Sequence, residues 1–142
     1  KPGVSKHFDE IMKLVAEHDA LDGIIFRVPY RDAGLYAQYR TDGGLYAKHL
    51  FMFKVSSRKQ IDDIQTRFDS TTIEITLDKS NPSHKKTLDL IRYATDRGFV
   101  VETHAEGSPD DWVKLIEAGV RIFHTKAPSK VRKLLQSLAD SK

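Results

Sequence analysis

The stretch GFVVETH at residues 98–104, followed by SPDDWVKLIEAG at residues 108–119, decides the fold class. The first stretch is an apolar run of strand length. The second opens with a Ser-Pro-Asp-Asp capping pattern and ends at a glycine, as helices commonly do. Another apolar run, VRIFHT at residues 120–125, follows that glycine directly. A strand, a helix and a second strand at this spacing predict a βα unit of a parallel sheet.

The same alternation extends toward the N-terminus. Three more runs of strand length are expected to form strands at residues 24–28, 50–55 and 71–77, which makes five with residues 99–104 and 120–125. Strands that alternate with helices favour a parallel sheet with right-handed crossovers. The expected fold is therefore α/β, with five βα units and a mainly parallel, TIM-barrel-like sheet that forms a partial or divergent barrel.

Helices are expected where apolar residues recur at a spacing of three or four. They cover residues 5–18, 57–68, 81–97, 108–119 and 129–139. Ser57 and Gln60 form a capping-box pattern at the start of the second helix. The pair Asn81-Pro82 supplies a cap and a first-turn proline for the third.

The composition predicts one globular domain over residues 1–142, because 39% of the residues are hydrophobic and 30% are charged. No apolar run approaches the roughly 18 residues of a membrane span, so a soluble protein is expected and the cytoplasm is slightly favoured. The chain starts at Lys1 without a signal-like segment, and it could be the C-terminal part of a larger barrel or associate with copies of itself.

Two features of the composition exclude classes of function. There are no cysteines, so thiol nucleophiles, zinc-thiolate sites and iron-sulfur clusters are ruled out. The formal charge is only +3 and the basic residues are dispersed, which argues against a nucleic-acid partner. P-loop, GxSxG, GxGxxG and HExxH motifs are also absent from the chain.

A short repeat interrupts the alternation of strands and helices. Residues 32–37 read DAGLYA and residues 42–47 read DGGLYA. One interpretation is a loop over the site whose tyrosines, Tyr30, Tyr36, Tyr39 and Tyr46, pack on a ligand. The other, which we favour, is a short irregular helix with Leu35 and Tyr36 packed on the core.

Polar side chains fall on one face of the predicted strands. Since neighbouring residues of a strand point to opposite faces, the residues opposite the apolar set can be identified. They are Arg27, Lys54, Glu74, Glu102 and His104, and either His124 or Lys126 ends the last strand. In parallel α/β folds the ligand site lies at the carboxyl ends of the strands, so these side chains are expected to converge there.

Two interpretations of this face remain open. In the functional one, Arg27 and Lys54 hold a small phosphate-containing ligand, while Glu74, Glu102 and His104 are catalytic and bind a divalent metal such as Mg²⁺ or Ca²⁺. In the other, the face is partly solvated and carries cross-strand ion pairs that each contribute less than about 1 kcal/mol.

Ser56 and Ser57 also stand at a strand end. They could donate hydrogen bonds to a phosphate at the N-terminus of the following helix, but capping of that helix explains them equally well.

The C-terminal part of the chain resembles the glycerophosphodiester phosphodiesterase family. The similarity lies in the strand at 98–104, the polar turn and acidic helix start at 108–112, the Gly119-Val120 pair and the proline-bearing loop at 125–128. It is clear over about residues 85–138. The resemblance implies a (βα)8 barrel that hydrolyses phosphodiesters.

Family features on earlier strands are missing from this sequence. That family carries a His-Arg pair on its first strand and a Glu-x-Asp metal pair on its second, and neither occurs on the corresponding strands here. Glu102 also replaces a family tryptophan. The chain is therefore expected to be either a phosphodiesterase-like domain that binds a phosphate ester, with metal-dependent hydrolysis, or a non-catalytic ligand-binding or assembly domain with the same fold.

Overall fold

The computed structural model describes residues 7–20, 23–36, 51–68 and 70–140. It contains one sheet of five strands, all parallel and ordered as they occur along the chain. The strands are β1 (Phe26–Pro29), β2 (Phe51–Val55), β3 (Thr72–Ile75), β4 (Val100–His104) and β5 (Val120–His124). The five predicted strands and their parallel pairing are thus confirmed. The sheet stays open, with β1 and β5 at its edges.

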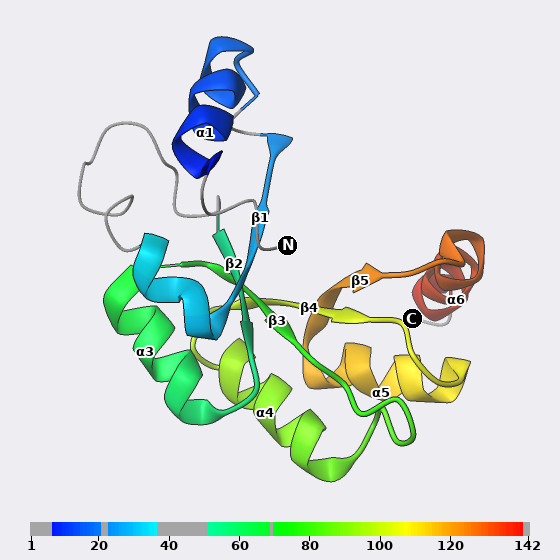
Figure 1. The fold of residues 1–142 in the computed structure, drawn as a ribbon. Helices are drawn as coiled ribbons and strands as arrows, with labels where there is room; N and C mark the ends of the chain where they lie inside the picture. The colour runs from blue at the N-terminus through cyan, green and yellow to red at the C-terminus, as the bar shows by residue number, and fades with distance from the viewer. Residues whose placement is uncertain (1–6, 21–22, 37–50, 69, 141–142) are drawn as a thin grey trace.

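The helices alternate with these strands. They are α1 (Phe8–Glu17), the 3₁₀ helix η3 (Tyr30–Tyr36), α3 (Arg58–Phe68), α4 (Lys85–Thr95), α5 (Pro109–Ala118) and α6 (Pro128–Asp140). Figure 1 shows α3, α4 and α5 on the same side of the sheet. That is the result of right-handed crossovers between strands that follow one another in order, and it matches part of a TIM-like barrel.

The main core lies between the sheet and these helices. Side chains of alternating strand residues are buried there with the apolar stripes of α3, α4 and α5. Its fully buried members include Phe53, Val55, Ile61, Ile64, Ile73, Ile75, Ile91, Val101 and Leu115. This burial on one face leaves the opposite face of the sheet to the polar residues.

An aromatic cluster fixes the start of the sheet. Phe8 of α1 lies 5.1 Å from Phe26 and 5.7 Å from Phe51, measured between ring centroids. Phe26 and Phe51 are the first residues of β1 and β2. The ring of Tyr36 packs edge-on against Phe8 at 4.9 Å. Helix α1 therefore covers the amino-terminal end of these two strands.

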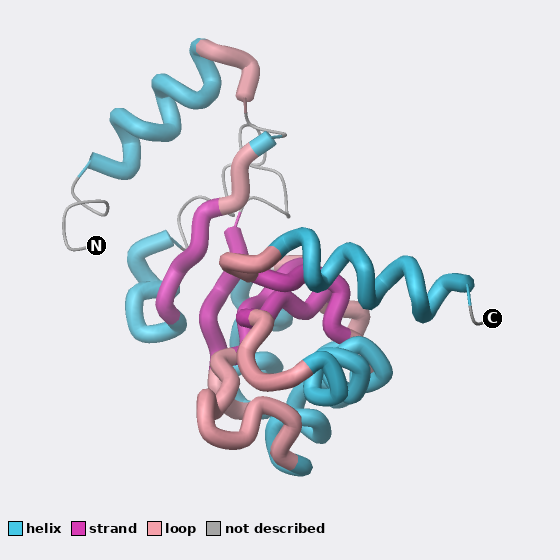
Figure 2. Tube along the Cα trace, turned by 90° about the vertical axis from the view of Figure 1, so that its right-hand side faces the viewer, coloured by secondary structure: helices cyan, strands magenta, loops and turns pink. Residues whose placement is uncertain are grey.

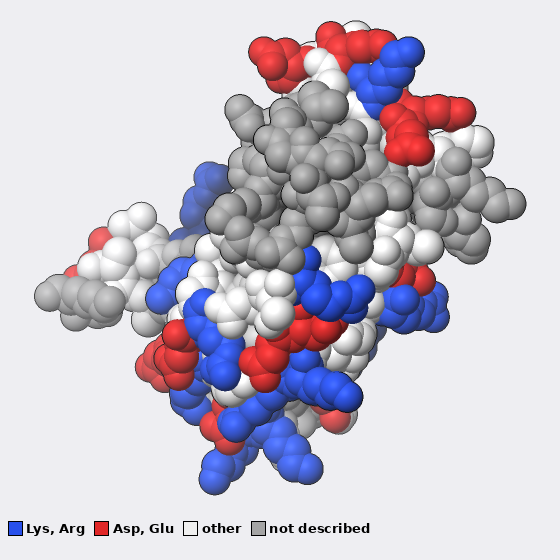
Figure 3. Space-filling view, turned by 90° about the vertical axis from the view of Figure 1, so that its left-hand side faces the viewer, with Lys and Arg blue, Asp and Glu red and all other residues white. Residues whose placement is uncertain are grey.

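The outer side of α3 is joined to its neighbours by two tyrosine hydroxyls. Tyr93 of α4 donates to Asp62, and Tyr30 donates to Asp63. Arg97 also donates to Asp62. Figure 3 shows this side of the molecule, where acidic and basic side chains are interspersed rather than separated.

Two sequence expectations about local structure are wrong. Helix α4 begins at Lys85 with His84 as its cap, and not at Asn81-Pro82. Asn81 takes part in two successive turns instead. Its backbone N–H donates to the backbone carbonyl of Asp78, and its backbone carbonyl accepts from the backbone N–H of His84.

The predicted irregular helix is present as η3, but only one of its two expected core contacts is observed. Tyr36 is buried as expected, whereas Leu35 is 61% exposed and does not pack on the core. Tyr39, Tyr46 and the second copy of the repeat at 42–47 lie outside the described residues.

Candidate functional site

The face of the sheet opposite the core helices carries the predicted site residues. They come from four neighbouring strands: Arg27 from β1, Lys54 from β2, Glu74 from β3, and Glu102 and His104 from β4. The strand register places Lys54 beside Glu74 and Glu74 beside Glu102. Period-two alternation therefore selected residues that the fold does bring together.

Glu74 is the centre of this group. It is 1% exposed, and its carboxylate accepts a 2.6 Å hydrogen bond from Arg27 Nη2. Arg27 Nε contacts the second carboxylate oxygen, so the ion pair is bidentate. Lys54 Nζ lies 3.6 Å and His104 Nε2 3.9 Å from Glu74 Oε1. A buried negative charge is thus surrounded by groups that are 38% to 41% exposed at the side chain.

Glu102 is the second buried carboxyl group. It is 5% exposed, and its Oε2 has no hydrogen-bond partner among the residues that the structure describes. Burial raises the pKa of Glu102, and the neighbouring negative charge of Glu74 raises it further. Ionisation of Glu102 is therefore disfavoured beside Glu74.

His104 packs against a second histidine. The rings of His104 and His124 lie 4.6 Å apart between centroids. Burial lowers the pKa of His104, and the charge of His124 lowers it further. A β-bulge creates this pair, because the register passes from Val101↔Val120 to Glu102↔Ile122. The extra residue on β5 brings His124 opposite His104, which regular alternation does not predict.

Four of the five predicted residues line one pocket of about 160 Å³. These are Arg27, Lys54, Glu74 and His104. Glu102 lies beside Glu74 but does not line the pocket. The remaining lining residues are Thr76, Leu77, Lys79 and Glu106. Sequence reasoning named none of these four as a site residue, although Thr76 shares the polar face of its strand with Glu74. The other three lie within four residues of the end of β3 or β4, a position that could have indicated them. Lys79 Nζ lies 4.0 Å from Glu106 Oε1.

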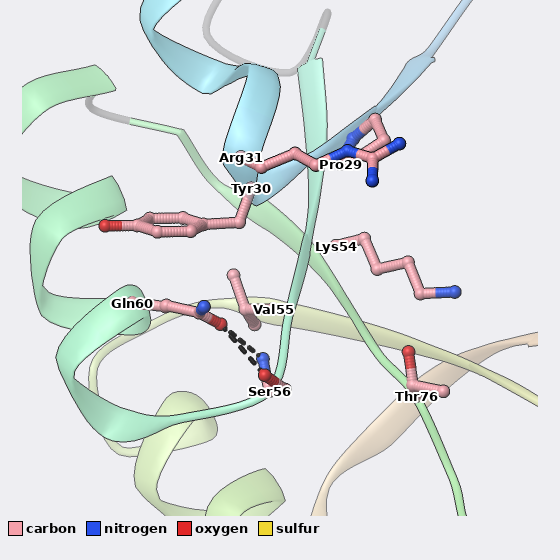
Figure 4. Close-up of a pocket in the computed structure, with 8 residues that line it drawn as sticks. All are labelled: Pro29, Tyr30, Arg31, Lys54, Val55, Ser56, Gln60 and Thr76. Atoms are coloured by element: carbon pink, nitrogen blue, oxygen red, sulfur yellow. Dashed lines mark hydrogen bonds between the residues drawn. The ribbon is translucent and has the colours of Figure 1, made fainter. Parts of the chain in front are cut away.

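A larger cavity of about 430 Å³ adjoins the first and shares Lys54 and Thr76 with it. It lies at the carboxyl ends of β1 and β2, where Pro29, Tyr30 and Val55 provide apolar surface. Figure 4 shows the Lys54 side chain pointing away from Tyr30 and Gln60, to the side of the cavity on which Thr76 lies.

The start of α3 forms one side of the larger cavity. Gln60 Oε1 accepts from the backbone N–H of Ser56 at 2.7 Å, and Ser57 Oγ accepts from the N–H of Gln60 (Figure 4 shows the Ser56–Gln60 contacts). Ser57 therefore caps α3, while Ser56 donates to the Gln60 side chain through both its N–H and its hydroxyl. The N–H of Ser56 is already used and does not await an anion.

The expected metal ligands do not form a metal-binding group. Within the described parts of the chain, no three His, Asp or Glu side chains are arranged to hold a metal ion. The reason is visible at Glu74, where both oxygens contact Arg27 and one also lies near Lys54. Glu74, Glu102 and His104 thus do not fit the Mg²⁺ or Ca²⁺ site expected from the sequence.

Comparisons with protein-family models, with curated proteins and with solved structures find no match to this chain. Among the described helices, none has the length and apolar character needed to cross a membrane.

Proposed function

We propose that this domain binds a small phosphate ester at the carboxyl ends of its strands, with the phosphate group between Arg27 and Lys54. The observation that supports this most directly is the shared position of these two side chains in the 160 Å³ pocket. Both are held by Glu74 yet remain partly exposed. The pocket is smaller than most pockets for whole organic ligands, and it suits a compact anionic group.

The hydrogen-bonding capacity of the pocket supports an anion. Arg27 carries five N–H donors and uses two of its nitrogens on Glu74. Lys54 has three donors and only a 3.6 Å contact to Glu74. Three basic and two acidic side chains line the pocket, so its net charge favours an anion. Guanidinium and ammonium groups at one place are the usual donors to phosphate oxygens.

The adjoining cavity gives the rest of the ligand a place. Because Lys54 and Thr76 border both cavities, a substituent esterified to the phosphate can extend toward Tyr30, Gln60 and Val55. The apolar walls and the side-chain amide there suit a small organic group with a few hydrogen-bonding atoms.

Calorimetry with inorganic phosphate tests this proposal. We expect saturable binding that weakens about tenfold or more in Arg27→Lys, because lysine keeps the positive charge beside Glu74 but loses the planar pair of donors. Arg92→Lys is the matched control, since Arg92 pairs with Asp89 on the surface of α4. Absence of phosphate binding in the wild-type protein, or equal weakening in both variants, would contradict the proposal.

Hydrolysis of a phosphodiester is the second candidate function. It is favoured by two pKa changes on β4, because the pKa of Glu102 is raised and that of His104 is lowered. A carboxyl group with a raised pKa keeps its proton to higher pH and can act as a general acid, while a histidine with a lowered pKa is more often neutral and can accept a proton. The alternative is a domain that binds the ester without cleaving it.

Release of the chromophore from a chromogenic phosphodiester distinguishes these two. The assay is run with and without Mg²⁺ or Ca²⁺, and with Glu102→Gln and His104→Asn beside the wild type. Turnover lost in both variants supports hydrolysis at this site. Phosphate binding without any turnover supports the non-catalytic domain.

A further inference from the structure

A groove runs between α5 and α6, away from the pocket at the strand ends. Its volume is about 740 Å³. Apolar side chains of both helices line it, Val113 and Ile116 from α5 and Leu135 and Leu138 from α6, together with the charged Glu117 and Arg121. Open grooves of this size with mainly apolar walls commonly serve as binding surfaces.

Helix α6 has little cover for its apolar stripe. Val131 is its one buried residue, and Leu135 is 46% exposed. Figure 2 shows the C-terminal end of α6 extending past the rest of the chain. An amphipathic helix ordinarily buries its apolar stripe against another element. Among the described residues, the part of this stripe around Leu135 is thus only partly covered.

The two charges in the groove suggest what covers it. Glu117 and Arg121 have opposite signs, and neither forms an ion pair with any described residue. The Arg121 guanidinium donates to the backbone carbonyls of Ile116 and Val120. A surface that carries both signs can be complementary to a second copy of itself, because a twofold axis sets each group against a different group of the partner. That rotation can bring Glu117 of one copy against Arg121 of the other, and the reverse.

We propose that a second copy of this chain occupies the groove. The α6 helices of the two copies pack against one another through Leu135 and Leu138 around a twofold axis, and Glu117 of each copy faces Arg121 of the other. The interface thereby combines an apolar centre with two symmetry-related ion pairs at its margin, as self-complementary interfaces commonly do.

Light scattering coupled to size-exclusion chromatography tests the interface. The molar mass measured for the full chain should be twice the 16.2 kDa of one copy. Leu135→Asp should elute with the mass of one copy, because a carboxylate is then placed in the apolar centre. Leu35→Asp is the matched control and should remain dimeric, since Leu35 is a 61% exposed leucine on η3, far along the chain from the groove. A monomeric wild type, or equal behaviour of the two variants, overturns the proposal.

A charge exchange tests it without touching the apolar surface. Glu117→Arg and Arg121→Glu should each raise the dimer dissociation constant by about tenfold or more, because like charges then face one another. The double variant should recover the wild-type constant. Both positions are exposed, so circular dichroism should show an unchanged fold. If Leu135→Asp fails to fold, this exchange decides: a double variant no tighter than the single ones overturns the twofold pairing.

Discussion

Arg27 and Glu74 form a bidentate ion pair that crosses strand β2. Arg27 lies on β1 and Glu74 on β3, and Arg27 Nη2 donates a 2.6 Å hydrogen bond to Glu74 Oε1 while Arg27 Nε contacts Oε2. Lys54 of the intervening strand lies 3.6 Å from the same oxygen. Three adjacent strands are thus connected through one buried carboxylate, which holds both candidate phosphate-binding cations in place.

Loss of that carboxylate should destabilise the fold. We expect Glu74→Gln to lower the free energy of unfolding by about 1–3 kcal/mol, the range for hydrogen bonds to charged groups. The loss should stay below that of a fully buried ion pair, because water reaches Arg27 and Lys54 and screens them. Urea denaturation measures it. Asp89→Asn, which removes the surface pair with Arg92, is the control and should cost less than about 0.5 kcal/mol.

Gly119 should tolerate no side chain. It ends α5 with φ at 120°, a left-handed conformation, and an added Cβ would collide with the side chain of Thr95. We expect Gly119→Ala to cost about 1–3 kcal/mol from backbone strain, with the collision adding to it. Thermal or urea denaturation should show this loss. Gly23→Ala, where a Cβ meets nothing within 4 Å, should leave stability nearly unchanged, and a similar loss in both variants would refute the explanation.

Much of the fold follows from local patterns in the sequence. The capping residues Ser108 and Gly119 delimit α5 correctly, and apolar runs locate all five strands to within about two residues. Asn81-Pro82 misled because turn formation competes with helix initiation for the same residue types. The predicted packing of Leu35 on the core is wrong because a short 3₁₀ helix exposes one of its sides, and the sequence does not reveal which side that is.

The site was predictable only in part, for a physical reason. Alternation determines the face on which Arg27, Lys54 and Glu74 lie, so their convergence could be expected. Alternation does not determine which side chains pair. Both carboxylate oxygens of Glu74 contact Arg27, and for this reason Glu74 does not fit the expected metal site. The bulge that aligns His104 with His124 depends on strand register, which has no local signal.

Asp111 should make the stability of this protein sensitive to acid. Hydrogen bonds from Ser83 and from the backbone and side chain of Ser108 lower the pKa of Asp111 to about 2, from 3.8. A lowered pKa in the folded state gives stability that is present above the unfolded value and is lost as pH falls from about 4 to about 2. Asp111→Asn should flatten this part of the stability curve, measured by urea denaturation at each pH. An unchanged acid slope would contradict the assignment.

Removal of the capping hydroxyl at the same helix end should have a cost at every pH. Ser108→Ala should lower the free energy of unfolding by about 1 kcal/mol, because the N–H of Asp111 loses its acceptor. Ser137→Ala is the control, since the Ser137 hydroxyl only donates to a carbonyl within α6. If both variants lose the same stability, the capping box does not hold α5 in the way we describe.

Glu102 should act on stability in the opposite direction to Asp111. Burial and the charge of Glu74 raise its folded-state pKa above the ordinary value of 4.5. A raised pKa means that the folded state holds the proton more tightly, so stability is fully present below pH 4.5 and falls as pH rises through the folded-state pKa. Glu102→Gln stays neutral at all pH values. Its stability relative to the wild type should therefore increase between about pH 4 and about pH 8, as urea denaturation across that range will measure.

His104, whose pKa is lowered, contributes the contrary slope below pH 6.5, so the comparison is repeated in His104→Asn. Glu17→Gln, on the exposed side of α1, should show no such trend. A Glu102→Gln curve parallel to the wild type in both backgrounds would show that the buried carboxyl ionises freely beside Glu74.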